Sequence, residues 1–226
     1  MKRGISQEAL KLIACITMLI DHIGAVLVPW MPLRIIGRLS FPIFCFLISE
    51  GVFHTRKPGK YALRIGICAL LSELPFDYCF FGRINWSHQN VMVTLLLGFC
   101  ALYAGKYITN FWMKILAAVP FVVISMFINA DYGVRGVLLI LMFGLTREFR
   151  LRPLVQFVGI FLIFFEPNGW PLFRVLGTSV TLQMTCVAAM LPIALYSGEK
   201  LTHNRFIQWG FYLFYPVHLL VLWLIR

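Results

Sequence analysis

The chain has 226 residues, of which 60% are hydrophobic and 13% charged, and its mean hydropathy is +0.84. Soluble domains are usually about 45–50% apolar and about 25% charged, so these values exclude an ordinary soluble enzyme. The net charge of +11 would fit nucleic-acid binding in a soluble protein. Here the basic residues fall mostly in short segments between apolar runs, which is the pattern that sets membrane topology. We therefore expect an all-α, polytopic integral membrane bundle and no nucleic-acid partner.

Apolar runs follow one another along the chain with short polar breaks between them. A hydrocarbon core of about 30 Å takes about 20 apolar residues per helix, so each run is a candidate span. The nine expected spans are 9–29, 35–53, 61–81, 90–108, 112–129, 134–147, 152–166, 176–197 and 206–225. The sixth and seventh are short, which favours a tilted or partly re-entrant course. With no internal repeat and no residues left for a separate domain, we expect a single domain over residues 1–226.

Basic residues also predict the orientation of these spans. With a cytoplasmic N-terminus, fourteen of the 20 Lys and Arg residues fall on the cytoplasmic side. This excess favours the N-in topology and, with nine spans, an external C-terminus. The first apolar run is long and contains Asp21 and His22, so it is expected to be a span and not a cleaved signal peptide. The expected location is the bacterial plasma membrane, in contact with its lipids.

Polar side chains inside the spans are the candidate functional groups. An ionisable group at the middle of a span costs at least about 2.5–3.5 kcal/mol, so its presence calls for a reason. In the expected topology one set falls in the outer half of the membrane or at its outer rim: Asp21, His22, Arg34, Arg38, Glu73, Asp77, Gln89, Asn90, Thr94, Asp131 and His218. Stretches far apart in sequence thus reach one depth, which predicts a polar site there.

Each of these groups also has a structural interpretation. In this interpretation the sole role of Asp21 is to pair with Arg38 and so stabilise the helical bundle. Glu73 and Asp77, at i and i+4 on one helix face, can neutralise arginines of a neighbouring helix. A histidine on an apolar face is often a core residue, but His22 stands beside a carboxylate, an arrangement that orients an imidazole for proton transfer.

A second polar group is expected on the cytoplasmic side. It contains Glu50 and the basic segment His54, Arg56, Lys57, Lys60 and Arg64. Guanidinium forks and ammonium groups of this kind bind phosphates, so the segment is a candidate phosphate-binding lip. The alternative is that these residues act only as a topology signal.

Several blocks of residues are familiar in this order. They are L-K-L-I-A-C-I-T-M-L-I-D-H-I-G, R-I-I-G-R-L-S-F-P-I-F-C-F, S-E-G-V-F-H-T-R, S-E-L-P-F-D and Q-N-V-M-V-T-L-L-L-G in the first hundred residues, and Y-P-V-H near the end. With them the chain resembles the TraX family, named after the conjugation-linked protein that acetylates the N-terminus of F pilin. The resemblance covers nearly the whole chain, although residues 110–200 contribute little to it.

The resemblance implies a membrane acetyltransferase related to a wider group that includes lysosomal heparan-α-glucosaminide N-acetyltransferase. Such a protein would take acetyl from cytosolic acetyl-CoA and pass it to an acceptor on the other side, without a metal. His22 would be the base, with Asp21 or another carboxylate setting its tautomer, and Arg38, Gln89 or Asn90 would polarise the thioester carbonyl. The further assignments are His218 to catalysis, His54, Arg56, Lys57, Lys60 and Arg64 to the CoA phosphates, and Glu73, Asp77, Gln89 and Asp131 to the acceptor.

Other functions also fit part of the sequence. A proton- or cation-coupled transporter would keep carboxylates such as Asp21, Glu73 and Asp77 in the membrane, but it usually shows paired repeats. A non-catalytic assembly factor would not need the histidines, and a metal enzyme would be expected to show an H-x-x-x-H or H-E-x-x-H motif. The sequence leaves open the acceptor (a protein N-terminus, a sugar or a small amine) and whether the protein is a homodimer.

Overall fold

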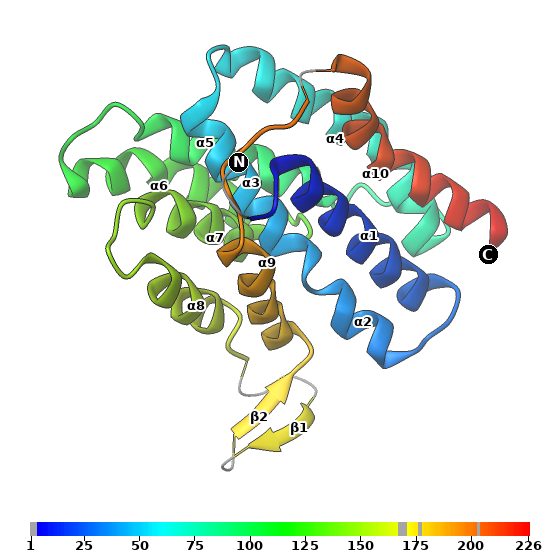
Figure 1. The fold of residues 1–226 in the computed structure, drawn as a ribbon. Coiled ribbons are helices and arrows are strands. Elements are labelled where there is room, and N and C mark those ends of the chain that lie inside the picture. The colour runs from blue at the N-terminus through cyan, green and yellow to red at the C-terminus, as the bar shows by residue number, and fades with distance from the viewer. Residues whose placement is uncertain (1–3, 167–170, 176–177, 203) are drawn as a thin grey trace. The chain divides into compact units, whose positions relative to one another are not determined.

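The computed structural model describes residues 4–166, 171–175, 178–202 and 204–226, and Figure 1 shows them as helices with one short hairpin. The helices up to residue 163 are α1 (Gln7–Val26), α2 (Met31–Gly37), α3 (Ser40–His54), α4 (Pro58–Phe81), α5 (Val91–Ala104), α6 (Phe111–Phe127), α7 (Gly133–Leu145) and α8 (Arg152–Ile163). The antiparallel strands β1 (Pro171–Val175) and β2 (Thr178–Thr181) follow, and then the 3₁₀-helix η1 (Gln183–Ala189), α9 (Met190–Ala194) and α10 (Arg205–Ile225).

Short polar residues set where several helices begin and end. The side chains of Ser6, Asn90, Asn110 and Asn204 accept backbone N–H groups in the first turns of α1, α5, α6 and α10. These caps satisfy donors that have no partner inside the helix. Gly82 ends α4 in the left-handed conformation, with φ 68°, which glycine adopts without steric cost. The polar breaks between the apolar runs are therefore the helix boundaries.

The chain divides into two compact units, each built from separate stretches of sequence. The first unit takes its residues from 1–44 and 148–211, together with residue 226, and the second from 45–147 and 212–225. In the first unit the first turn of α1 is hydrogen-bonded to residues 199–202. The Glu8 carboxylate accepts the backbone N–H groups of Leu201 at 2.9 Å and Thr202 at 3.4 Å. The Gln7 N–H donates to the Glu199 carbonyl at 2.9 Å.

In the second unit α5 packs against α4, α6 and α7. Small residues allow α5 and α7 to approach closely. A Cβ atom on Gly98 of α5 would lie 2.3 Å from Ile140 Cδ1 of α7, and one on Gly144 of α7 would lie 2.4 Å from Leu102 Cδ1 of α5. Small residues at such contacts are typical of helix packing in membranes, where close van der Waals contact replaces the hydrophobic effect.

Helix positions predicted from the apolar runs agree with the structure over most of the chain, but two runs differ. The run 35–53 contains the end of α2 and most of α3, with a break at residues 38–39. The run 176–197 is not one helix, because it contains β2, η1 and α9. The hairpin is thus an exception to the all-α expectation, and the β-branched residues in T-S-V-T favour the strand.

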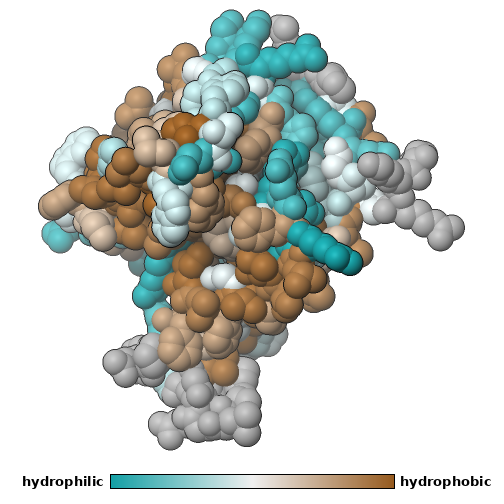
Figure 2. Space-filling view, turned by 90° about the vertical axis from the view of Figure 1, so that its left-hand side faces the viewer, coloured by the Kyte–Doolittle hydropathy of each residue, from teal (hydrophilic) through white to brown (hydrophobic). Residues whose placement is uncertain are grey.

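Among the residues that the structure describes, three helical stretches are long and apolar enough to cross a membrane: Gln7–Val26, Met31–His54 and Phe206–Ile225. Large apolar side chains are exposed along the helices, among them Leu70 at 79%, Phe127 at 83% and Phe206 at 88%. Figure 2 shows broad apolar areas on the face that it draws. A soluble monomer rarely exposes so much contiguous apolar surface, which fits a protein that lies in lipid. The described helices support a membrane bundle, while the number of nine spans stays a prediction.

Candidate functional site

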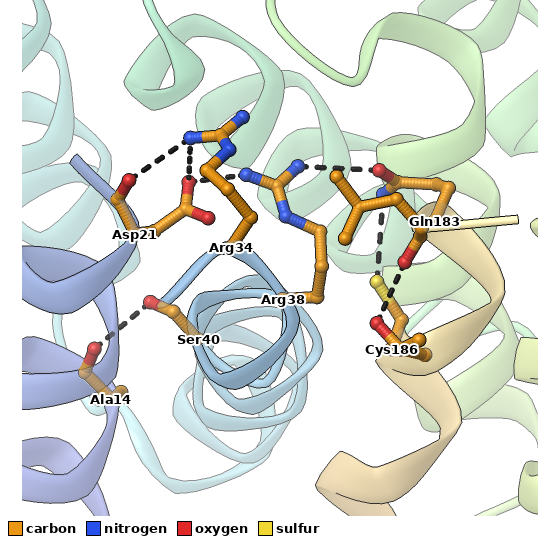
Figure 3. Close-up of polar contacts among 9 residues, drawn as sticks. Ala14, Asp21, Arg34, Arg38, Ser40, Gln183 and Cys186 are labelled. Carbon is orange, nitrogen blue, oxygen red and sulfur yellow. Dashed lines mark hydrogen bonds and ion pairs between the residues drawn. The ribbon is translucent and has the colours of Figure 1, made fainter. Parts of the chain in front are cut away.

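A buried cluster of charged side chains joins α1 to α2 in the first unit. The Asp21 side chain is enclosed, since the residue is only 6% exposed. Its Oδ2 atom accepts a hydrogen bond from Arg34 Nη1 at 2.9 Å and pairs with Arg38 Nη2 as well. Arg34 Nη1 also donates to the Asp21 backbone carbonyl at 3.0 Å. One carboxylate thus faces two guanidinium groups in a largely buried place (Figure 3).

Glycines bring the two helices close enough for these ion pairs. A Cβ atom on Gly37 of α2 would lie 2.1 Å from Asp21 Cβ and 2.5 Å from its Cα. A Cβ on Gly24 of α1 would lie 2.8 Å from Leu33 Cβ of α2. Distances below 3.0 Å require something to move, so α1 and α2 can pack in this way only with glycine at both positions.

The cluster extends to residues that the sequence did not single out. Arg38 Nη1 donates to Gln183 Oε1 of η1 at 3.2 Å, and Gln183 Nε2 lies 3.4 Å from the buried Cys186 sulfur. Beside it, Ser40 Oγ donates to the Ala14 carbonyl at 2.9 Å (Figure 3). A lone amide in the apolar run 176–197 was the available signal for Gln183. The Gln183 amide oxygen thus accepts from the Arg38 nitrogen that does not pair with Asp21.

His22, the predicted base, follows Asp21 on α1 and is half-buried. Successive residues of an α-helix point about 100° apart, so the two side chains leave the helix in different directions. The Asp21 carboxylate is directed at the two arginines. The ion pair between Asp21 and Arg38, which the structural interpretation of Asp21 predicts, is therefore present. The catalytic roles of His22, Asp21 and Arg38 stay predictions.

A second polar cluster lies where α4 ends and α5 begins, in the second unit. Glu73 Oε2 accepts from the backbone N–H of Asn90 at 3.3 Å and from its side-chain Nδ2. Asn90 is fully buried and also donates to the Ala69 carbonyl at 2.8 Å. One turn after Glu73, Asp77 Oδ2 accepts the backbone N–H of Asn85 at 2.8 Å. Within the described residues no ion pair of either acid with Lys or Arg is found, and the alternative that they neutralise arginines stays a prediction.

The loop before α7 joins this cluster through backbone pairing. The N–H of Gln89 donates to the Asn129 carbonyl at 2.8 Å, and the N–H of Asp131 donates to the Gln89 carbonyl at 3.0 Å. The Thr94 hydroxyl then donates to the Asp131 carbonyl at 2.7 Å. The predicted acceptor-side residues Glu73, Gln89 and Asp131 are thus brought together with Asn90.

His218, the second predicted catalytic histidine, lies in α10 and is 6% exposed. Its Nδ1 atom donates to the Phe214 carbonyl at 2.7 Å, and its ring stacks on the Phe214 ring with the centroids 4.8 Å apart. This bond fixes the tautomer, because it leaves Nε2 as the unprotonated ring nitrogen of the neutral imidazole. The enclosed position fits the structural interpretation of His218, and its catalytic role stays a prediction.

The predicted phosphate-binding lip lies before and in the first turns of α4. Arg56, Lys57 and Lys60 are exposed, and none of the three has an ion pair among the described residues. Arg64 is half-buried and hydrogen-bonds to the side chain of Tyr212. His54 differs from the others, since its Nδ1 atom bonds to the Glu50 carbonyl at 2.8 Å.

Glu50, which the sequence analysis placed in the same cytoplasmic polar group as the lip, lies near the end of α3. The Glu50 carboxylate pairs with Arg147 Nε at 3.2 Å, and the Arg147 guanidinium lies over the Phe53 ring at 4.8 Å. One oxygen of this acid therefore pairs with Arg147, and the other lies 3.7 Å from Nδ1 of His54, the lip residue at the end of α3.

Comparison with known proteins agrees with the sequence motifs. The model of the TraX protein family matches residues 6–226. The chain belongs to the TraX family. This TraX-family chain is 28% identical, over 98% of its length and 97% of the relative, to a Dichelobacter nodosus protein described as "Probable fimbrial assembly protein FimC, serogroup H1". It is 26% identical, over 96% of its length and 90% of the relative, to the protein RP591 of Rickettsia prowazekii (strain Madrid E). No solved structure matches the chain.

Proposed function

We propose that this chain is a multi-pass acetyltransferase of the bacterial plasma membrane. It moves acetyl from cytosolic acetyl-CoA to an acceptor amine or hydroxyl on the extracytoplasmic side. The observation that carries the proposal is the match to the TraX family over residues 6–226, because that family is associated with F-pilin acetylation. A relative that is similar over almost its whole length is described as a fimbrial assembly protein, which is consistent with a pilus subunit as one acceptor.

The cluster around Asp21 supports this chemistry. Attack on a thioester carbonyl builds negative charge on the carbonyl oxygen, and fixed donors in a buried place stabilise that charge most effectively. Arg34 and Arg38 are held there by the Asp21 carboxylate between them, so their guanidinium groups are fixed donors of this kind. In the proposed step the acceptor nitrogen or oxygen bonds to the acetyl carbon and the carbon–sulfur bond breaks. His22 takes the acceptor proton and returns it to the departing CoA thiolate.

The segment before α4 supports CoA binding. Its exposed cations Arg56, Lys57 and Lys60 are free of ion pairs in the described residues and surround the N-terminus of α4. Unpaired N–H groups and the helix dipole favour phosphate at such an end. These residues therefore fit the phosphates of CoA better than His54, whose ring is bound to the end of α3.

Binding of acetyl-CoA to purified protein in detergent tests the proposal, measured by thermal shift and calorimetry. We expect binding by the wild type that survives His22→Ala and weakens several-fold with Arg56→Ala. Arg150→Ala, which removes an exposed arginine outside the lip, is the matched control and should bind like the wild type. A folded, monodisperse wild type that does not bind acetyl-CoA would overturn the acetyltransferase assignment.

A further inference from the structure

The two acids of α4 each keep one enclosed oxygen without a hydrogen-bond donor. Glu73 Oε1 and Asp77 Oδ1 have no donor among the described residues. Asp77 is fully buried, whereas Glu73 is only partly buried. In that part of the chain no ion pair of either acid with Lys or Arg is found. Buried polar groups in native proteins are almost always hydrogen-bonded, so two open atoms one helical turn apart require an explanation.

Donors close to the pair are already engaged. The side-chain Nδ2 atom of Asn90 donates to the other oxygen of Glu73 and to the Ala69 carbonyl at 2.8 Å, which uses both of its N–H groups. The Ser72 hydroxyl donates to the Cys68 carbonyl at 2.6 Å. These donors are neutral, and none of their N–H or O–H bonds reaches an open oxygen. The two open oxygens therefore depend on a donor that these side chains do not supply.

Titratable groups of other elements also face the pair. His88, in the loop after α4, lies within electrostatic range of Glu73, but it forms no ion pair with this acid among the described residues. Tyr215 of α10 is 4% exposed and lies within electrostatic range of Glu73 and of Asp131, which precedes α7. Of these three neighbours, His88 alone can carry a positive charge. The surroundings of the pair thus contain more acidic groups than basic ones.

Two ionised carboxylates are unfavourable in this position. Burial penalises each charge that lacks a partner, and like charges at i and i+4 of a helix repel each other. One bound proton removes one of the two charges and turns one open oxygen into an O–H donor. Carboxyl pairs in proteins share a proton in this way, because two carboxylates close together do not both ionise. A proton therefore answers both the charge and the missing donor.

We propose that Glu73 and Asp77 share one bound proton at neutral pH, so that this end of α4 is a proton-binding site. The proton comes from water, and Glu73 is the member of the pair that lies nearer the surface. Its loss leaves two adjacent carboxylates, which weakens the contact between the end of α4 and the start of α5. In the predicted topology this end of α4 faces the extracytoplasmic side, and the site responds to the pH there. The inference goes beyond the proposed acetyl transfer and does not depend on it.

Infrared spectroscopy of the purified full-length protein in a maltoside detergent tests the proposal, because a protonated carboxyl group has a C=O band that a carboxylate lacks. Ordinary Asp and Glu side chains, with pKa values of about 3.9 and 4.3, are ionised at pH 7. We expect a carboxyl band at pH 7 that shifts in D₂O, whereas the ester bands of residual lipid do not shift.

Variants assign this band to the pair. Glu73→Gln and Asp77→Asn should each remove it, because the remaining acid no longer faces a second charge. Two control variants should keep the band. Glu148→Gln removes an exposed acid, and Glu50→Gln removes a buried acid that is paired with Arg147.

Thermal unfolding of the same samples at pH 5.5 and pH 7.5 gives a second readout and shows that the variants are folded. A proton that the folded state binds and the unfolded state has lost makes the free energy of unfolding fall as the pH rises. The Tm of the wild type and of Glu148→Gln should therefore fall over this range by more than the Tm of Glu73→Gln and Asp77→Asn.

Three outcomes would overturn the inference. The first is a folded wild type without an exchangeable carboxyl band at pH 7. The second is a band that persists in Glu73→Gln or in Asp77→Asn, because a single acid would then hold the proton. The third is an equal pH dependence of the Tm in the wild type and in both of these variants.

Discussion

At the scale of single residues, the cluster around Asp21 shows how far sequence reasoning reaches. Arg34 and Arg38 are one turn apart, and Asp21 is the acid of the preceding helix, so the ion pair could be predicted from spacing and charge. Gln183 could not, because its position beside Arg38 depends on the packing of η1, which is 145 residues away in sequence. Periodicity within a helix does not contain that information.

The first prediction concerns Asp21→Asn. The neutral amide would leave two guanidinium groups close together without the carboxylate that they share, and breaking a buried ion pair in this way costs about 3–5 kcal/mol. We expect a clearly lower Tm in detergent. Glu148→Gln, an exposed acid, should change it little. An Asp21→Asn protein as stable as the wild type would show that the ion pairs do not hold α1 to α2.

The second prediction concerns Gly37→Ala. The added methyl would lie 2.5 Å from the Asp21 Cα, which is backbone and cannot rotate away, so α1 and α2 would have to separate. Overpacking of this kind costs about 1–3 kcal/mol. We expect a lower Tm and weaker acetyl transfer, since Arg34 and Arg38 would move. Gly210→Ala in α10 is the matched control, because nothing lies within 4 Å of its added Cβ; a similar loss there would point to a general effect of alanine.

At the scale of elements, the apolar runs predicted where most helices lie but not how each run folds. Boundaries followed from polar residues with a local role, such as Asn90 and Asn204 at helix starts. The break between α2 and α3 and the hairpin before η1 were missed, because hydropathy over a window is the same for one long helix and for shorter elements of equal composition. Near the start of the run 176–197, the β-branched residues of T-S-V-T favour a strand. A count of apolar residues does not take this preference into account.

The third prediction concerns the contact between α5 and α7. Gly98→Ala would place its methyl 2.3 Å from Ile140 Cδ1, so the single variant should unfold at a lower temperature. Ile140→Val removes that carbon atom, and on its own it leaves a small cavity that costs about 0.5–1.5 kcal/mol. The double variant should be more stable than the sum of the two single changes predicts, as measured by thermal unfolding of all four proteins. Simple additivity would show that the contact does not limit the spacing of these helices.

At the scale of the whole molecule, the main expectation is the course of the chain through the membrane. The helix α4 has 24 residues, which gives about 36 Å at 1.5 Å per residue, enough to cross a hydrocarbon core of about 30 Å. It is not among the three long apolar stretches because it contains several charged residues. Its orientation is therefore predicted from the distribution of basic residues and not from hydropathy alone. Lys57 and Lys60 at its start favour a cytoplasmic position for that end.

The fourth prediction tests this orientation with single cysteines at the two ends of α4. Lys57→Cys should be labelled by a membrane-impermeant maleimide only after the cytoplasmic side is opened. Trp86→Cys, at a residue that is 76% exposed, should be labelled in intact cells. Labelling of the wild type measures the reaction of the native cysteines, most of which are buried, and serves as the control. Labelling of both variants from one side would mean that α4 does not cross the membrane.

The separate stretches that build each unit also govern how the protein can be made. Glu8 binds Leu201, which is synthesised 193 residues later, and the second unit needs 212–225 from the end of the chain. Since α1 is synthesised long before residues 199–202, its first turn lacks these partners during most of translation. Contacts between distant parts of a sequence are the slowest to form. A premature stop before residue 200 would therefore leave both units incomplete, and quality-control proteases would meet a chain in which Glu8 lacks its late partners.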